Sequence, residues 1–291
     1  MLNPHNDRLN YSMLLSPPDT YKPDFAVGTS YSLDLDALTG VCLSLGLSDE
    51  PDSKTAKNPI ALLEALRITG DKIALFCETG NIFLPKKITT LYTLLEQTVY
   101  EVKTSPKKSI SGYPAFHPKF WLIRYINETD SPLYRIIVLS RNLTFDRSWD
   151  ISFCMDGRQQ NVKTDKNQPV IDFIEYLLRF LPNEYAPKKR AKIRSMLREL
   201  PYIRFDTESK EFYDFDFLPV GIPNYNINRK EFDSLFSDSF HELLVMSPFL
   251  SDSVIRDFNN RNKYIEHSEY ALITRASSLS KIKPESCSNF K

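Results

Sequence analysis

The sequence has few cysteines, no excess of either charge and no long apolar run, and each absence excludes a class of protein. Its four cysteines are widely separated, with no C-x-x-C pair and no His–Cys cluster at zinc spacing, so neither a disulfide framework nor a structural metal is expected. The 37 basic residues balance the 37 acidic ones, so a site for a polyanion has to come from local clustering. No cofactor is indicated.

No segment approaches about 18 uninterrupted apolar residues, and the N-terminus lacks a basic stretch followed by an apolar one. We therefore expect a cytoplasmic protein without a membrane partner. At 291 residues and 42% hydrophobic content, the chain is long and apolar enough to bury a substantial core, which excludes disorder of the whole.

Hydrophobic patterning predicts an α/β fold in which a mixed sheet is flanked by helices. Apolar residues in the segment 34–45 recur at spacings of three and four, as on the buried face of a helix. Strands that alternate with helices are typical of a parallel or mixed sheet covered on its faces. Strands are predicted at 25–31, 72–77, 99–103, 115–125, 134–139 and 148–155, and helices at 34–45, 59–66, 88–96, 170–181 and 188–200.

A second strand, helix and strand are predicted at 242–247, 252–259 and 270–274, in the order already seen at 72–103. The match is one of pattern and not of sequence. We interpret it as two related halves, the first complete and the second truncated. The predicted organisation is an N-terminal arm at 1–24, a first half at 25–205, a connecting segment at 206–240 and the start of an incomplete second half at 241–291.

Candidate chemistry gathers around one short motif. The sequence FHPKFWLIRY places His117 and Lys119 two positions apart on a predicted strand, so that both side chains project from one face. The next apolar strand ends in SRNLT, which puts Ser140 and Asn142 at a strand end, where the ligand-facing groups of α/β sheets gather. A nucleophile or proton carrier, a fixed cation and a neutral donor are what a phosphate site needs.

A lone H-x-K is weak evidence, because a histidine that only satisfies local hydrogen bonds is the default interpretation. The combination of H-x-K, a second apolar strand and S-x-N-L-T at its end favours the functional interpretation. Taken together, His117-Pro-Lys119 and Ser140-Arg141-Asn142-Leu-Thr resemble the H-x-K…S-x-N half-site of the phospholipase D superfamily.

The resemblance implies a phospholipase D-like fold and a metal-independent phosphodiesterase in which two half-sites meet at a pseudo-twofold axis. In that superfamily one histidine attacks phosphorus and forms a phosphohistidine, and the other protonates the leaving group. Carried over, His117 is the catalytic histidine, Lys119 holds the phosphate, Asn142 is its partner and Ser140 helps to orient them. The specific part of the resemblance covers about 30 residues around the motif; beyond it only the architecture is similar.

The chain departs from the common form of the motif at one position. An acidic residue usually follows the lysine after five positions, whereas this sequence has Arg124 there. The branch of tyrosyl-DNA phosphodiesterase and related bacterial nucleases also lacks that acid. The departure therefore favours a nuclease or DNA-end-processing enzyme with nucleic acid, DNA above all, as partner.

Further candidates lie beside the motif and in two basic runs. Arg141 and Asp146 are expected to support the site, and Trp149 either stacks on a base or, as is commoner beside a strand, belongs to the core. The basic runs at 103–108 and 187–198 are candidate contacts for a phosphate backbone. For the second run a solvated face of an amphipathic helix is an equally good interpretation.

No second H-x-K follows His5, His241 or His267, so the sequence carries one half-site. Three explanations compete, in the order in which we favour them: a truncated chain, a homodimer that completes the site across a twofold axis, and a degenerate binding protein. After the nuclease, the second hypothesis is a catalytically silent nucleic-acid-binding module of the same fold. The third is a phospholipase-type lipid hydrolase.

Overall fold

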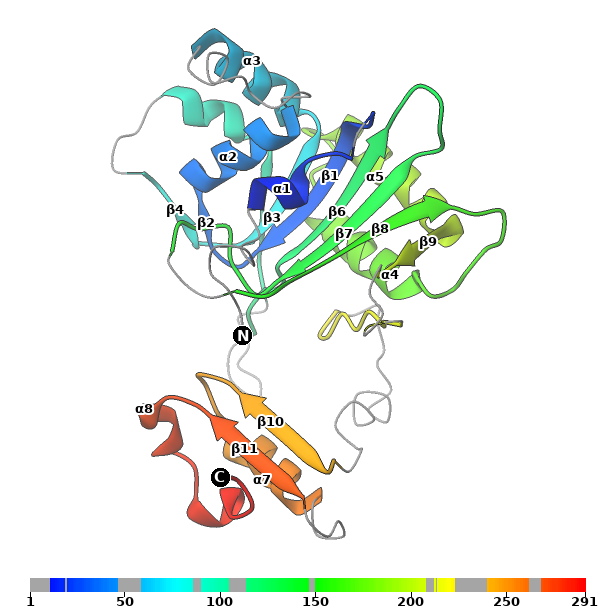
Figure 1. Cartoon of the computed structure of the whole chain (residues 1–291). Coiled ribbons are helices and arrows are strands. Elements are labelled where there is room, and N and C mark those ends of the chain that lie inside the picture. Colours follow the sequence, from blue (N-terminus) through cyan, green and yellow to red (C-terminus); the bar gives the residue numbers. More distant parts are fainter. Residues whose placement is uncertain are drawn as a thin grey trace. The chain divides into compact units, whose positions relative to one another are not determined.

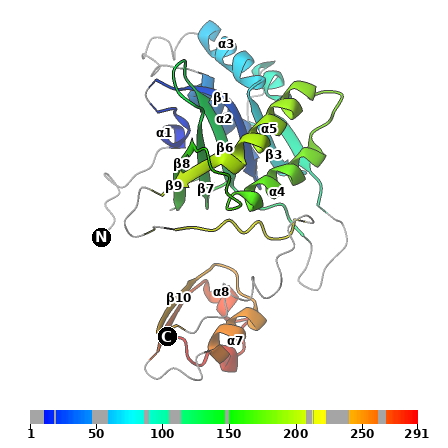
Figure 2. The same ribbon diagram turned by 90° about the vertical axis from the view of Figure 1, so that its right-hand side faces the viewer.

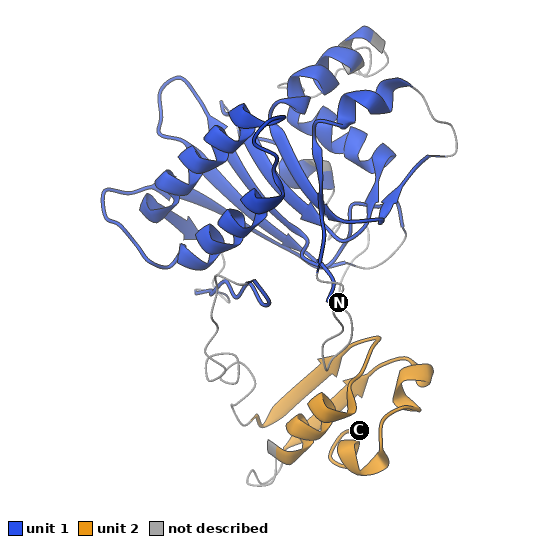
Figure 3. Ribbon diagram, turned by 180° about the vertical axis from the view of Figure 1, so that it is seen from behind, with its two compact units in different colours: residues 1–225 blue, residues 226–291 orange. Residues whose placement is uncertain are grey.

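The computed structural model divides into two compact units, residues 1–225 and 226–291 (Figure 3). It describes residues 11–18, 20–46, 59–85, 90–104, 114–146, 150–207, 212, 214–222, 240–261 and 268–291. No helix in these described ranges is both long and apolar enough to cross a membrane.

Unit 1 is built on a seven-stranded mixed sheet with the strand order β5-β3-β1-β6-β7-β8-β9 (Figure 1). Neighbours among β1, β3 and β5 are parallel, and every pair from β1–β6 to β8–β9 is antiparallel. The predicted mixed sheet flanked by helices is thus confirmed. The strands are β1 (Lys22–Ser30), β3 (Ile73–Glu78), β5 (Val99–Val102), β6 (Phe120–Ile126), β7 (Leu133–Leu139), β8 (Ser152–Gln159) and β9 (Ile203–Asp206).

Helices cover both faces of this sheet (Figure 2). One face carries α1 (Tyr11–Leu15), α2 (Leu35–Gly46), α3 (Pro59–Gly70) and the 3-10 helix η1 (Thr90–Leu95). The other carries α4 (Gln168–Leu177), η2 (Leu178–Phe180), α5 (Pro187–Glu199) and η3 (Leu200–Tyr202). Two short strands, β2 (Leu33–Asp34) and β4 (Ile82–Phe83), pair in parallel beside the main sheet.

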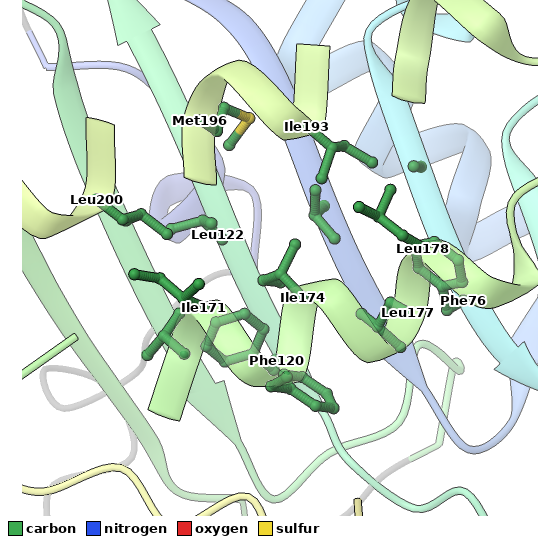
Figure 4. Close-up of a cluster of buried hydrophobic side chains, with 14 of the residues drawn as sticks. Phe76, Phe120, Leu122, Ile171, Ile174, Leu177, Leu178, Ile193, Met196 and Leu200 are labelled. Atoms are coloured by element: carbon green, nitrogen blue, oxygen red, sulfur yellow. The ribbon is translucent and has the colours of Figure 1, made fainter. Parts of the chain in front are cut away.

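Strand β6 shows why the sheet is buried on both sides. Successive side chains of a strand point to opposite faces, so a strand covered on both is apolar throughout. Phe120 and Leu122 pack under α4 and α5 (Figure 4), whereas Trp121 and Ile123 pack under α1 and α2. The two cores therefore share one sheet, which fixes the ends of its strands in space.

The beginning of β6 corrects one prediction. The strand starts at Phe120 and not at Ala115, so His117 and Lys119 lie in an extended segment that precedes it. Pro118 has no N–H to donate to a ladder, and the N–H of Phe116 is donated to the Glu78 carboxylate. Side chains therefore hold most of this segment, and one backbone hydrogen bond, from the Leu139 N–H of β7 to the Lys119 carbonyl at 2.9 Å, joins its end to the sheet.

Unit 2 contains β10 (Glu242–Met246), α7 (Asp252–Arg261), β11 (Glu269–Ile273), α8 (Ala276–Leu279) and η5 (Pro284–Cys287). The predicted strand, helix and strand are confirmed, and β10 and β11 pair in parallel. Phe290 forms a further parallel bridge to Tyr270 of β11. Three parallel segments thus follow one another in the order seen for β1, β3 and β5.

The predicted domain boundaries stay predictions, but the structure adds detail to the predicted arm. Residues 11–15 of that arm form α1, and Leu14 and Leu15 are buried in the core of unit 1. The guanidinium group of Arg135 donates to the carbonyl oxygens of Leu14 and Ser16 at 3.1 and 2.8 Å, which fastens this helix to the sheet.

Candidate phosphate site

Polar residues collect at one edge of the sheet in unit 1. The carboxyl ends of the parallel strands β1 and β3 lie there, together with the amino end of the antiparallel β6 and the carboxyl end of β7. The residues at or just beyond these ends are Tyr31, Glu78, Lys119 and Ser140. The sheet topology therefore brings the H-x-K and S-x-N segments to the same edge.

Two neighbouring residues at the end of β1 anchor both segments. The Thr29 hydroxyl donates to the Pro118 carbonyl at 3.1 Å and accepts the Phe120 N–H at 3.0 Å. The Ser30 hydroxyl accepts the N–H of Leu143 at 2.9 Å. Because Pro118 lies between His117 and Lys119, and Leu143 follows Asn142, the two motif segments are held by adjacent residues of one strand.

His117 and Lys119 are in direct contact. The ammonium nitrogen of Lys119 lies 2.8 Å from Nδ1 and 3.3 Å from Nε2 of the His117 ring, and it donates to the His117 carbonyl at 3.0 Å. A donor along the lone pair of one ring nitrogen would lie much farther from the other. The ammonium group is thus close to both nitrogens at once, which places it against the ring and not on a single lone pair.

Burial and charge set the protonation of this pair. Lys119 is only 8% exposed, and burial lowers the pKa of its ammonium group to about 8. His117 is exposed as a whole, but desolvation of its ring and the neighbouring Lys119 charge lower its pKa below the usual range. Near neutral pH we therefore expect an uncharged imidazole beside a mostly charged ammonium group.

No carboxylate in the described part of the chain neutralises the charge of Lys119. Among the residues that the structure describes, no aspartate or glutamate forms an ion pair with Lys119. Buried charges are normally paired. A buried cation at the edge of a sheet, beside an exposed histidine, is consequently suited to an anion from outside the chain.

Asn142 is half-buried at the end of β7. Its Oδ1 atom is buried and has no hydrogen-bond partner within the described part of the chain. Buried polar atoms are seldom left unsatisfied, and the oxygen and nitrogen of an amide are assigned from their partners. An amide with an unused hydrogen-bonding position fits the predicted role of a ligand-binding residue.

The predicted supporting residues brace the loop between β7 and β8. Ser140 donates to the Asp150 carboxylate and accepts the N–H of Ile151, both at 2.9 Å. Arg141 forms ion pairs with Asp146 and Asp150, each at 3.4 Å. Their hydrogen bonds are thus used within the loop, which indicates support and not contact with a ligand. Trp149 lies outside the described residues.

Sequence reasoning did not single out Tyr31 or Glu78. The Tyr31 ring lies 4.8 Å from the His117 ring between centroids and 5.9 Å from Lys119 Nζ. The Glu78 carboxylate accepts from the Phe116 N–H and, at 3.1 Å, from the Thr104 hydroxyl. Tyr31 directly follows β1 and Glu78 ends β3, and this placement at a strand end is the one signal by which they could have been found.

The residue at the position of the missing acid takes no part in the site. Arg124 lies farther along β6, where it pairs with Glu199 at 2.9 Å and with Asp24, and Asp24 also pairs with Lys192. This ion-pair network joins the sheet to α5. Arg124 therefore has a structural role in this chain.

Part of the basic run of α5 is engaged inside unit 1. Lys189 is buried and donates to the carbonyls of Ile73, at 2.7 Å, and Gln97. Arg190 donates to the carbonyls of Leu178 and Leu181. These two residues pack the helix onto the sheet, so the amphipathic interpretation holds for them. Residues 105–108 of the other basic run lie outside the described ranges.

In the described ranges, histidine, cysteine and acidic side chains form no group of three or more that could hold a metal ion. No protein-family model and no curated protein matches the chain. Among solved structures, polyphosphate kinase from Porphyromonas gingivalis is similar over 91% of this chain and 35% of its own, with 12% identity and a TM-score of 0.38. So weak a likeness carries no argument about activity.

Proposed function

We propose that the sheet edge with His117, Lys119 and Asn142 binds the phosphate of a phosphodiester, and that the chain supplies one half-site of a metal-independent phosphodiesterase. The observation that carries the proposal is the buried Lys119 ammonium group, which contacts the exposed His117 and has no carboxylate partner among the described residues. An arriving phosphate supplies the missing negative charge.

Each residue has a distinct role in this proposal. A ring nitrogen of His117 attacks phosphorus, a nitrogen–phosphorus bond forms, and the bond to the leaving oxygen breaks. Lys119 and Asn142 stabilise the charge on the remaining phosphate oxygens. The lowered pKa of His117 keeps its ring uncharged near neutral pH, so that a lone pair is present for the attack.

The leaving oxygen needs a proton, which a second histidine supplies in this scheme. The printed sequence has no second H-x-K, so the partner half-site comes from further sequence or from a second copy of the chain. Water then hydrolyses the phosphohistidine and restores His117.

We propose DNA as the substrate, and a nuclease or DNA-end-processing reaction as the activity. The support is the motif resemblance together with the buried positive charge of Lys119, which has no carboxylate partner among the described residues. A silent nucleic-acid-binding module of the same fold is the second candidate, because one half-site alone explains binding without turnover.

Binding of a single-stranded DNA oligonucleotide to wild type and to Lys119→Met tests the phosphate site. Methionine keeps an unbranched side chain of nearly the same length and removes the charge, so we expect affinity to fall roughly tenfold or more. Lys163→Met is the matched control. It replaces an exposed lysine in the loop after β8, which ends at the opposite edge of the sheet, and should bind within about twofold of wild type.

Equal affinity of wild type and a folded Lys119→Met variant would overturn the proposal. Binding of RNA of the same sequence and of phosphatidylcholine vesicles is measured in parallel, which separates a nucleic-acid substrate from a lipid substrate. Preference for the vesicles would contradict DNA as substrate and leave the phosphate site itself in place.

A further inference from the structure

An aromatic side chain occupies the place beside His117 and Lys119 where a counter-ion is usual. Tyr31 directly follows β1, and its ring is tilted by 41° to the His117 ring with 4.8 Å between centroids. The Lys119 ammonium nitrogen lies 5.9 Å from the centre of the same ring. One aromatic ring is thus near both groups of the proposed site.

The end of β1 holds Tyr31 firmly in this position. Its carbonyl accepts a hydrogen bond from the buried Cys77 thiol at 3.5 Å. The residues on either side, Ser30 and Ser32, are linked by a hydrogen bond of 2.6 Å from the Ser30 hydroxyl to the Ser32 carbonyl. The ring therefore projects from a backbone that is fixed to the sheet.

An aromatic ring does what a carboxylate cannot do at an anion site. Its negative face attracts a cation, but the ring carries no net charge. A carboxylate beside Lys119 would cancel the positive charge and repel a phosphate. A tyrosine can hold the ammonium and imidazole groups in place and leave their charge for the ligand.

We propose that Tyr31 is a positioning residue for His117 and Lys119, acting through the face of its ring and not through its hydroxyl group. The inference rests on the proposed function, since it explains how a phosphate site keeps its charge. It adds a residue that the motif does not contain.

Three variants separate the ring from the hydroxyl group and from general damage. Tyr31→Phe keeps the ring, Tyr31→Leu replaces it with an apolar side chain that has no π face, and Tyr185→Leu changes a tyrosine that is 85% exposed. The imidazole of His117 is titrated by NMR without any added anion, and its signal is assigned with His117→Ala. Sulfate affinity is then measured by calorimetry.

We expect Tyr31→Leu to lower the midpoint of the His117 titration by about half a pH unit, because the protonated ring loses its aromatic neighbour. Sulfate affinity should fall roughly fivefold in the same variant. Tyr31→Phe and Tyr185→Leu should keep the wild-type midpoint and bind sulfate within about twofold.

The inference is overturned if Tyr31→Leu leaves the midpoint unchanged or raises it. It is also overturned if Tyr31→Phe shifts the midpoint as far as Tyr31→Leu does, because the hydroxyl group would then be the active part. A wild-type chain that binds no sulfate contradicts the proposed function. The titration, which needs no anion, still decides whether Tyr31 holds His117.

Discussion

Lys119 is a buried cation whose charge the described residues do not balance, and its protonation should therefore control anion binding. Sulfate is a suitable probe because it stays a dianion from pH 6 to 10. As pH rises through the pKa of about 8, Lys119 loses its proton in the free site, whereas a bound sulfate keeps it protonated. We expect sulfate affinity, measured by calorimetry, to fall towards about tenfold per pH unit above this value.

Lys119→Gln is the control for this pH dependence, since it removes the titrating group and should abolish the decline above pH 7. A wild-type affinity that stays constant from pH 7 to 10 would contradict the assignment. The stability of the anion-free protein changes in the opposite sense. Between the folded pKa of about 8 and the ordinary value of 10.5, the unfolded chain binds the additional proton, so this lysine makes the free energy of unfolding rise with pH.

At the level of residues, the sequence predicts the motif better than its surroundings. His117 and Lys119 were expected to lie together, and their side chains are in contact. Asn142 was expected beside them, and the structure brings its segment to the same edge through Ser30. Tyr31 was not predicted as a site residue, because an aromatic residue at a strand end is usually assigned to the core when its neighbours in space are unknown.

Among the elements, β1 and β6 approach each other closely at Gly28. A Cβ atom at Gly28 would lie 2.5 Å from the Trp121 ring, so a side chain there displaces a fully buried indole. We expect Gly28→Ala to lower the free energy of unfolding by about 1–3 kcal/mol, the usual cost of overpacking a core. Urea unfolding followed by circular dichroism measures this.

Gly40→Ala is the matched control for the same substitution. Gly40 lies within α2, and a Cβ atom there meets nothing within 4 Å. Alanine has the higher helix propensity, so this variant should be as stable as wild type or more stable by roughly 0.5–1 kcal/mol. Equal destabilisation by both substitutions would show that the approach of β1 to β6 is not what requires glycine.

Periodicity predicts most elements of this chain, and its failures have local causes. The predicted helix at 88–96 is the 3-10 helix η1 over its described part, where the Glu96 N–H donates to the Thr93 carbonyl three residues back. Strand β9 was not predicted, since its four residues at 203–206 are too short for a periodic signal. Its position as the outermost strand of the sheet depends on tertiary contacts.

For the whole molecule, one half-site should bind phosphate and turn over slowly. We expect the isolated chain to cleave bis(p-nitrophenyl) phosphate at or near the background rate, because no second H-x-K in the printed sequence supplies the leaving-group proton. Light scattering during the assay establishes whether the chain is a monomer. Rapid cleavage by a monomer that His117→Ala abolishes would contradict the half-site hypothesis.

Where a second half-site is present, hydrolysis should proceed unchanged in EDTA, since side chains replace the metal in this scheme. His117→Ala should lower the rate of hydrolysis by several orders of magnitude. Lys119→Ala should also lower this rate severely. Asn142→Ala should cost roughly 10²–10³-fold, the scale of one preorganised donor. A metal nuclease would be favoured instead if EDTA stopped the reaction, Mg²⁺ restored it and His117→Ala kept a rate within about tenfold of wild type.

The anchoring of both motif segments on the end of β1 also sets when the site appears during folding. Thr29 contacts Pro118 and Phe120 across 89 and 91 positions of sequence, and Ser30 contacts Leu143 across 113. Closing the intervening loops costs entropy before such distant contacts can form, so we expect them to form late. A partly folded chain with its helices in place would accordingly have no affinity for anions. Sulfate should then slow the unfolding of the native protein and leave its folding rate almost unchanged.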